Sequence, residues 1–569
     1  MKKIIAGCIL ACIISTFGYA QTNNPVSIYE GMQIQSVRFN YENLPTDTAL
    51  SDTYRRSIES EFKITPQSQF NNFISSFYIS QLKLLPFVQD AQLVTVLSDQ
   101  NLILITVDIL FLSEEKKAQG IQSAFSNAKL LPVLYNSERL FITLKAAASE
   151  MVYSNDNAWF ARPQAMTAGN PLAENPSGKG YTAWLEGFAS AGIYAIANII
   201  PKINLHLYGG ANYLVSFSAG NELFTDKGRF YGDIEEAFAG LIGGGHTKRG
   251  KIYKYNLTYG RKQFTLGDGW LITNTSMNGY NRAALQLNPR WASKELIQVG
   301  FSWDKLLVQG FRLRPNELGI LNSQTVINGF DIQLSNKKNG LIAFSFLQVS
   351  ESDYRYYLPD GTILTRKGLQ VYNLRIFKNT GQKGGLFFKA EAGYQRNSNF
   401  AMNAWAYYRE FGWNFAKTKG SPAVSYRFAY FSGDKPDTKP YNRWDPLYTG
   451  GNGEQWVQGS NMYKIVQNSN EMTHRLQAVY SPLQKLQLVG QIWLFYAPRK
   501  NNLGGNPALS TLTSKFYGSE YNLTVKFFLS HNWYLHLNTA YTIPGGAIKD
   551  AVSGTKNWFC LSFFARYSF

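Results

Sequence analysis

The chain has 569 residues and a formal net charge of +18, yet only 17% of its residues are charged and 15% are aromatic. No segment after the N-terminus offers about 18 uninterrupted apolar residues, which argues against a protein that crosses a membrane with helices. The longest candidate, Phe188 to Ile200, is too short and contains Asn198.

The N-terminus has the layout of a secretion signal. Two lysines precede an apolar run within residues 2–17, and residues 18–20 read Gly-Tyr-Ala, with small residues at the two positions that signal peptidase reads. We therefore expect a signal peptide over residues 1–20, a flexible segment over 21–29 and an exported mature chain.

Cysteine use agrees with this interpretation. Cys8 and Cys12 lie in the leader, so only Cys560 remains after cleavage and no intrachain disulfide forms. A lipoprotein signal at Cys12 is the weaker alternative, because Leu10 is bulky where a small residue is usual. Export, together with the lack of a compact basic helix, disfavours a nucleic-acid partner despite the positive charge.

The next segment predicts a small α+β domain. Residues 32–41 alternate like a strand, and Asp52 is placed to cap a helix that runs to Phe62. Ser68 precedes a second helix with aromatic residues at helical spacing. A hairpin follows within residues 90–112.

This β-α-α-β-β order over residues 30–112, with Pro86-Phe87-Val88 at the end of the second helix, resembles a single POTRA domain, the periplasmic module of Omp85-type transporters. The resemblance implies that the domain binds extended polypeptide at a sheet edge. The alternative is a small periplasmic docking surface or lid that binds another periplasmic protein.

A linker over residues 113–136 leads into a region, 137–569, with repeated two-residue alternation. In residues 253–259, for example, tyrosine or leucine alternates with lysine, asparagine and threonine. Such strands have one apolar and one polar face, which is typical of transmembrane barrels. We predict an all-β transmembrane barrel of about 18 antiparallel strands behind the α+β domain. The expected strands are 138–150, 181–199, 202–216, 230–241, 251–262, 280–290, 294–304, 324–334, 339–351, 368–379, 384–395, 400–416, 421–433, 470–481, 484–497, 516–529, 531–543 and 556–569.

The connections between these strands alternate in length. Short turns, such as 200–202, 288–290 and 481–483, alternate with long segments, such as 263–279 and 305–323. Outer-membrane barrels have short periplasmic turns, long outer loops and an even strand number that returns both ends to the periplasm. We therefore expect a lipid-embedded barrel in the bacterial outer membrane with its N-terminal domain in the periplasm.

The last strand, "NWFCLSFFARYSF", resembles the C-terminal recognition signal of outer-membrane barrels, which ends on Phe after alternating aromatic or apolar residues. The resemblance implies that the barrel assembly machinery recognises Phe563, Tyr567 and Phe569.

Strand charges are expected to point into the lumen, because the outer face lies in lipid. The predicted lumen cations are Lys254, Arg375, Lys389, Arg427, Arg475, Lys526 and Arg566. Glu391 is one possible partner for them, while Glu235 and Glu236 are adjacent and are expected to diverge to opposite faces. Arginine and lysine in a pore lining favour anions.

The positive charge is concentrated in the barrel. The leader contributes +2 and residues 21–112 contribute −4, which leaves +20 for residues 113–569. Many of these cations are alternatively solvated loop residues or contacts to anionic lipid head groups.

Two stretches resemble the alginate export family of outer-membrane barrels over residues 180–569. "YGRKQFTLGDGWL" supplies Arg261 and Asp268, and "YRFAYFSGDKPDTKPYNRWDPLYTG" supplies Asp434 and Asp445. The resemblance implies an 18-stranded pore with a basic lumen that passes an anionic polysaccharide. Lys262 departs from the family pattern, so the identity of the polymer is left open.

Enzymatic sites are not expected. The segment 245–251 has the spacing of a phosphate-binding loop, but Ile252 occupies the Ser/Thr position. Asp434, Asp437 and Asp445 offer oxygen ligands for calcium, although a solvated loop explains them better. We predict no cofactor and no metal site.

The sequence thus predicts an outer-membrane pore for anionic polysaccharide or other anionic solutes. The alternative is an Omp85-like barrel for protein assembly or secretion, whose POTRA domain binds client polypeptides.

Overall fold

The computed structural model describes residues 29–66, 68–97, 103–112, 131–249, 251–336, 340–378, 384–415, 417–450, 456–483, 485–530 and 532–568. The predicted signal peptide, nearly all of the expected flexible segment, most of the linker and Phe569 lie outside these residues.

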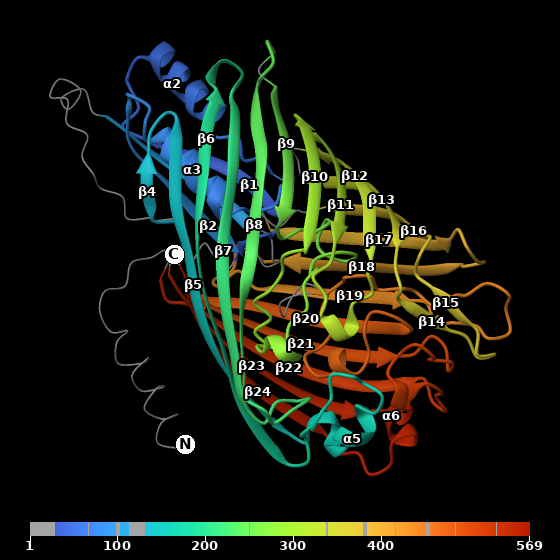
Figure 1. Cartoon of the computed structure of the whole chain (residues 1–569). Coiled ribbons are helices and arrows are strands. Elements are labelled where there is room, and N and C mark those ends of the chain that lie inside the picture. Colours follow the sequence, from blue (N-terminus) through green and yellow to red (C-terminus); the bar gives the residue numbers. More distant parts are fainter. Residues whose placement is uncertain are drawn as a thin grey trace.

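Most of the chain forms a closed antiparallel barrel of 18 strands (Figure 1). Each strand pairs with the next along the chain, and β24 closes the barrel on β5, from Phe559 opposite Asp156 to Ser568 opposite Ala147. The barrel strands are β5 (Leu140–Asp156), β6 (Tyr181–Ile200), β7 (Leu205–Gly220), β8 (Arg229–His246), β9 (Ile252–Arg261), β10 (Glu295–Trp303), β11 (Leu306–Arg314), β12 (Val326–Asn336), β13 (Gly340–Glu351), β16 (Leu369–Lys378), β17 (Gly385–Asn397), β18 (Ala404–Asn414), β19 (Ala423–Phe431), β20 (Glu471–Leu483), β21 (Leu486–Tyr496), β22 (Phe516–Phe528), β23 (Trp533–Pro544) and β24 (Trp558–Ser568).

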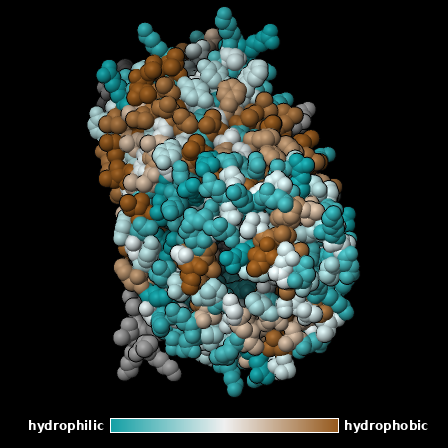
Figure 2. All heavy atoms as spheres, turned by 45° about the vertical axis from the view of Figure 1, so that its right-hand side comes forward, coloured by the Kyte–Doolittle hydropathy of each residue, from teal (hydrophilic) through white to brown (hydrophobic). Residues whose placement is uncertain are grey.

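The two faces of the wall differ as the alternation predicts. In β18, Trp405, Phe411 and Trp413 point outward and are exposed, whereas Tyr408 and Glu410 point inward and are buried. The outward aromatic residues near both strand ends form the interfacial girdles of a membrane barrel. Apolar side chains accordingly gather on the outer wall in Figure 2.

Seventeen of the 18 predicted strand ranges overlap an observed strand, and one prediction is wrong. Residues 280–290 belong to a single long connection, 262–294, and contain only a short 3-10 turn, Tyr280–Arg282. The missing strand is β11, which follows β10 after a tight turn at Asp304 and Lys305. The total of 18 strands is nevertheless confirmed.

Smaller elements lie in the connections. They are β4 (Val133–Asn136), which extends the edge of β5, the hairpin β14 (Arg355–Tyr357) and β15 (Ile363–Thr365), and the short helices α5 (Pro163–Met166) and α6 (Gly546–Ala551). No helix within the described ranges is both long and apolar enough to cross a membrane.

The N-terminal elements occur in the predicted β-α-α-β-β order. They are β1 (Ile34–Glu42), α2 (Thr48–Glu61), α3 (Asn72–Leu82), β2 (Val88–Leu97) and β3 (Ile103–Phe111). The sheet order is β1-β3-β2, with β1 parallel to β3.

The two helices of this domain begin at residues other than those predicted. Asp47 caps α2 by accepting from the Ala49 amide at 2.9 Å, so this helix begins before Asp52. Asn71 caps α3 in the same way, accepting from the amide of Ile74 at 2.8 Å, in place of Ser68. Both caps use the short polar side chains that satisfy free N–H groups at helix starts.

Candidate pore and vestibule

The seven predicted lumen cations all lie on the inner face of the wall. Arg375, for example, is buried between the exposed outward side chains of Leu374 and Ile376. Their surroundings differ, however. Arg427 lies over the rings of Trp456 and Trp493, with its guanidinium carbon 4.4 and 5.4 Å from the ring centroids.

Two of these cations are neutralised by carboxylates that the sequence patterns did not single out. Arg375 forms a buried ion pair with Asp331 and also donates to the Ser345 hydroxyl at 3.1 Å. Glu391 lies directly across from Arg375 on β17, but the ion pair is with Asp331. Arg475 donates to Glu410 at 2.6 Å.

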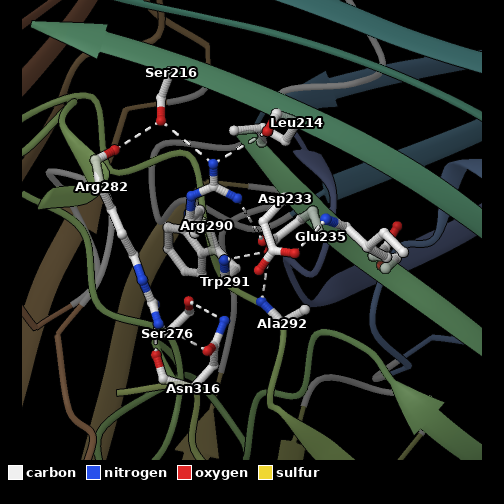
Figure 3. Close-up of polar contacts among 12 residues, drawn as sticks. Leu214, Ser216, Asp233, Glu235, Ser276, Arg282, Arg290, Trp291, Ala292 and Asn316 are labelled. Carbon is white, nitrogen blue, oxygen red and sulfur yellow. Dashed lines mark hydrogen bonds and ion pairs between the residues drawn. The ribbon is translucent and has the colours of Figure 1, made fainter. Parts of the chain in front are cut away.

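The long connection 262–294 folds against the inner wall (Figure 3). One carboxylate oxygen of Glu235 accepts from the backbone amides of Trp291 at 2.6 Å and Ala292 at 2.7 Å. Arg290 reaches the carbonyl of Leu214 on β7 at 3.1 Å. These contacts fix the end of the connection to β7 and β8, so it narrows the lumen.

A bulge in β8 explains why Glu235 is available for this contact. The pairing register with β7 shifts at Asn212, so that Glu235 and Glu236 both point inward. The prediction that these glutamates diverge is therefore wrong, because a bulge adds one residue and resets the alternation. Glu236 binds Lys145 at 3.4 Å and the hydroxyl of Tyr194 at 2.5 Å.

Removal of the Glu235 carboxylate should free this connection. Charge-assisted hydrogen bonds contribute about 1.5–3 kcal/mol each, so we expect Glu235→Ala to make residues 262–294 sensitive to protease. Cleavage rates on the folded barrel measure this effect. Glu235→Gln keeps an acceptor oxygen and should be cleaved more slowly than Glu235→Ala; equal resistance of both variants and the wild type would contradict the anchoring role.

The first family motif lies at the start of the same connection. Arg261 ends β9 and donates to Asp233 at 3.1 Å. Asp268 accepts from the hydroxyl of Tyr408 on β18 at 2.9 Å, across the barrel from β9. Trp270 stacks on Trp444, with ring centroids 5.6 Å apart. The motif thus holds the connection across the lumen.

The second motif stabilises an outer loop. The carboxylate of Asp445 receives two hydrogen bonds from Arg366, at 2.7 and 2.9 Å, and one from Tyr356 at 2.5 Å. Asp434 accepts from the amide of Asn442 at 2.9 Å. Among the described residues, no cluster of three or more His, Cys, Asp or Glu side chains that could hold a metal ion occurs, and so none includes Asp434 or Asp445.

The outer loops surround a cavity of about 270 Å³, which we call the vestibule. Figure 2 views this end of the molecule and shows a mostly hydrophilic surface hollowed at its centre. The basic lining residues are Arg355, Arg443 and Lys464, and burial lowers the pKa of the Lys464 amine. The lining carboxylate of Asp445 is already paired with Arg366.

Aromatic side chains form much of the remaining vestibule wall. They are Trp159, Tyr354, Tyr356, Tyr441 and Trp444. The sequence patterns missed these residues and the vestibule cations, because loop residues show no two-residue period. The only available signal was the family motif at Asp445, which is next to Trp444 and two residues from Arg443.

The N-terminal domain lies against the inner wall at the end with the short turns (Figure 1). Phe73 of α3 packs on Tyr194 of β6, and Phe77 packs on His206 of β7, with ring centroids 5.3 and 5.4 Å apart. The Lys254 amine donates to the Thr65 hydroxyl at 3.0 Å. Lys254 therefore contacts the N-terminal domain.

The domain also meets the folded-in connection. Gln69 donates to the carbonyl of Thr265 at 2.7 Å. One buried apolar cluster includes residues of the domain together with Phe141, Tyr194 and Phe238 of the barrel wall. The domain and residues 262–294 thus form a continuous layer across part of the lumen.

These features define the class of the protein: an outer-membrane β-barrel channel for solutes. The family model for alginate export matches residues 218–560, which is more than half of the chain. The chain therefore belongs to the alginate export family, as the two motifs indicated. No curated protein matches it.

Solved outer-membrane porins share low identity with this chain. A double variant of OccD1 (OprD) is 9% identical with a TM-score of 0.45, over 75% of this chain and 95% of that one. OccK5 (OpdH) of Pseudomonas aeruginosa is 8% identical with a TM-score of 0.44, over 75% of this chain and 97% of that one. A BenF-like porin from Pseudomonas fluorescens is 10% identical with a TM-score of 0.42, over 75% of this chain and 98% of that one.

Proposed function

We propose that this channel passes anionic saccharides or other anionic solutes through its vestibule. The observation that carries the proposal is the combination of Arg355, Arg443 and Lys464 with aromatic walls in one cavity. Guanidinium groups recognise carboxylates by paired hydrogen bonds, and flat aromatic faces suit the apolar faces of sugar rings.

Farther in, the inner wall supplies further positive charge. Lys389, Arg427 and Lys526 lie on the inner faces of β17, β19 and β22, beyond the vestibule. Arg375 and Arg475 contribute less net charge, because each is paired with a carboxylate. Attraction spread over several sites lowers the energy of an anion in the channel and still lets it leave.

Reversal potentials across planar bilayers test the selectivity. We expect a preference for chloride over potassium in the wild type. In Arg443→Gln/Lys464→Gln, the ratio of chloride to potassium permeability should fall by about fivefold, equivalent to about 1 kcal/mol of lost attraction between the vestibule and the anion. Lys435→Gln, which removes an exposed loop charge outside the vestibule, serves as the matched control and should change little. A cation preference in the wild type would refute the proposal.

A second candidate follows from the β-α-α-β-β order of the N-terminal domain, as in POTRA modules. Strand β2 is an edge of its three-stranded sheet, and such an edge accepts an added strand. We propose this Omp85-like role as the alternative. Crosslinking of unfolded barrel polypeptides to residues 88–97 would favour it, and crosslinking indistinguishable from that of an unrelated periplasmic domain would count against it.

We further propose that the barrel assembly machinery recognises the last strand. Phe563 and Tyr567 both point outward from β24, where an insertion partner has access to them. Phe563→Ser/Tyr567→Ser should therefore slow membrane insertion, measured as the fraction of newly made chain that is folded in the outer membrane. Phe564→Ser, on the inner face, is the control.

A further inference from the structure

A row of polar side chains crosses five adjacent strands on the outer surface of the barrel. Its members are Arg312, Asn328, Gln348, Gln370 and Arg396, and each lies directly opposite the next in the strand pairing. Each member is one to three residues from the loop-side end of its strand. We call this row the polar strip.

An aromatic row runs beside the polar strip, two residues nearer the short turns. Phe330, Phe346, Tyr372 and Tyr394 are likewise successive cross-strand partners. Their neighbouring ring centroids are 5.8, 5.2 and 6.3 Å apart. Outward aromatic residues mark the boundary between hydrocarbon and head groups. The polar strip therefore lies at the head-group level of the outer leaflet.

The two arginines of the polar strip have free hydrogen-bonding capacity. Arg312 donates to Asn328 at 3.3 Å, and Arg396 donates to Gln370 at 2.7 Å. Each guanidinium carries five N–H donors. Within the described part of the chain, no carboxylate forms an ion pair with either residue, whereas the nearby Arg314 pairs with Glu351 at 3.5 Å.

The amides of the polar strip add donors and acceptors between the two charges. Gln348 is exposed, and Asn328 donates to Ser350 at 3.0 Å, which fixes its orientation. Guanidinium groups bind phosphate with two parallel hydrogen bonds, and amides suit sugar hydroxyls. The outer leaflet of a bacterial outer membrane consists of phosphate-bearing glycolipid, which offers both groups at this depth.

We propose that the polar strip is a binding site for a phosphate-bearing glycolipid of the outer leaflet. Phosphates contact Arg312 and Arg396, and sugar groups contact the amides between them. The acyl chains then lie along the apolar wall below the aromatic row. This site is on the outer surface and does not depend on what passes through the lumen.

Native mass spectrometry of protein extracted from outer membranes in mild detergent tests the proposal. We expect the wild type to retain the glycolipid and Arg312→Gln/Arg396→Gln to lose it, with affinity weakened by about tenfold or more. Lys378→Gln removes an outward charge at the short-turn end of β16 and should retain the glycolipid. Wild type without bound glycolipid, or a double variant that retains as much as the wild type, overturns the proposal.

A second measurement distinguishes the lipid from free phosphate. Added purified glycolipid should raise the thermal unfolding midpoint of the wild type in detergent, and it should raise that of the double variant less. Inorganic phosphate should leave both midpoints unchanged. Equal stabilisation by inorganic phosphate would assign the site to a free anion and overturn the lipid proposal. Because the readout is binding, failure of anion selectivity in the lumen leaves this test unaffected.

Discussion

Truncation of the barrel-wall residues beneath the N-terminal domain, in Phe141→Ala/Tyr194→Ala, is expected to increase single-channel conductance. Both side chains contact Phe73 of the domain, with ring centroids 6.3 and 5.3 Å away. Buried aromatic-to-alanine changes cost about 3–5 kcal/mol each. If a third of this lost free energy belongs to the contact between the N-terminal domain and the wall, the ratio of docked to undocked domain falls by more than about tenfold.

Planar-bilayer recordings measure the effect as larger or longer openings. Tyr54→Ala is the control, because Tyr54 stacks on Phe87 within the domain, with ring centroids 4.0 Å apart. Its conductance should remain that of the wild type. Equal conductance in the wall variant and the wild type, with both barrels folded, would show that the domain does not limit passage.

The barrel was largely predictable because lipid acts on one face of every strand. In β18 and β24 every outward side chain except that of Arg409 is apolar or aromatic, and this two-residue period is visible without any tertiary information. The inward direction of all seven lumen cations follows from the same constraint.

The exceptions occur where lipid hydrocarbon does not cover the apolar residues of a segment or the outer face of a strand. In β11, Arg312 and Arg314 point outward at the loop-side rim, so the strand lacks an uninterrupted apolar face. The apolar residues within 280–290 have a different explanation: Ala284 and Leu287 are buried inside the barrel against inner-wall residues. Local periodicity cannot distinguish burial in protein from burial in lipid.

The docking of the N-terminal domain was also hidden from the sequence. Nine of the eleven residues of helix α3 are buried, three serines among them, so the helix is covered on more than one side. The second covering surface is the barrel wall, more than 50 residues away in the chain. The ion partners of Arg375 and Arg475 were missed for the same reason, since each lies two strands away in the wall and is set by the strand register.

Breaking the buried ion pair between Arg366 and Asp445 is expected to have the largest effect on stability. The side chains are 4% and 0% exposed, and Arg366 contacts both carboxylate oxygens. Arg366→Gln leaves a buried carboxylate without its cation, which costs about 3–5 kcal/mol. The loop that carries Asp445 lines the vestibule, so we also expect weaker anion selectivity.

Replacement of both partners distinguishes the effect of the ion pair on stability from a general destabilisation of the loop. Arg366→Gln/Asp445→Asn removes the unpaired charge, so it should be more stable than Arg366→Gln alone, since an uncharged amide costs less to bury. Equilibrium unfolding in urea of Arg366→Gln, Asp445→Asn and the double variant, with the barrel in lipid vesicles, gives the three free-energy differences for the cycle. If the loss of unfolding free energy in the double variant equals the sum of the losses in the two single variants, the two residues act independently. The aromatic packing, and not the ion pair, would then stabilise the shape of the vestibule.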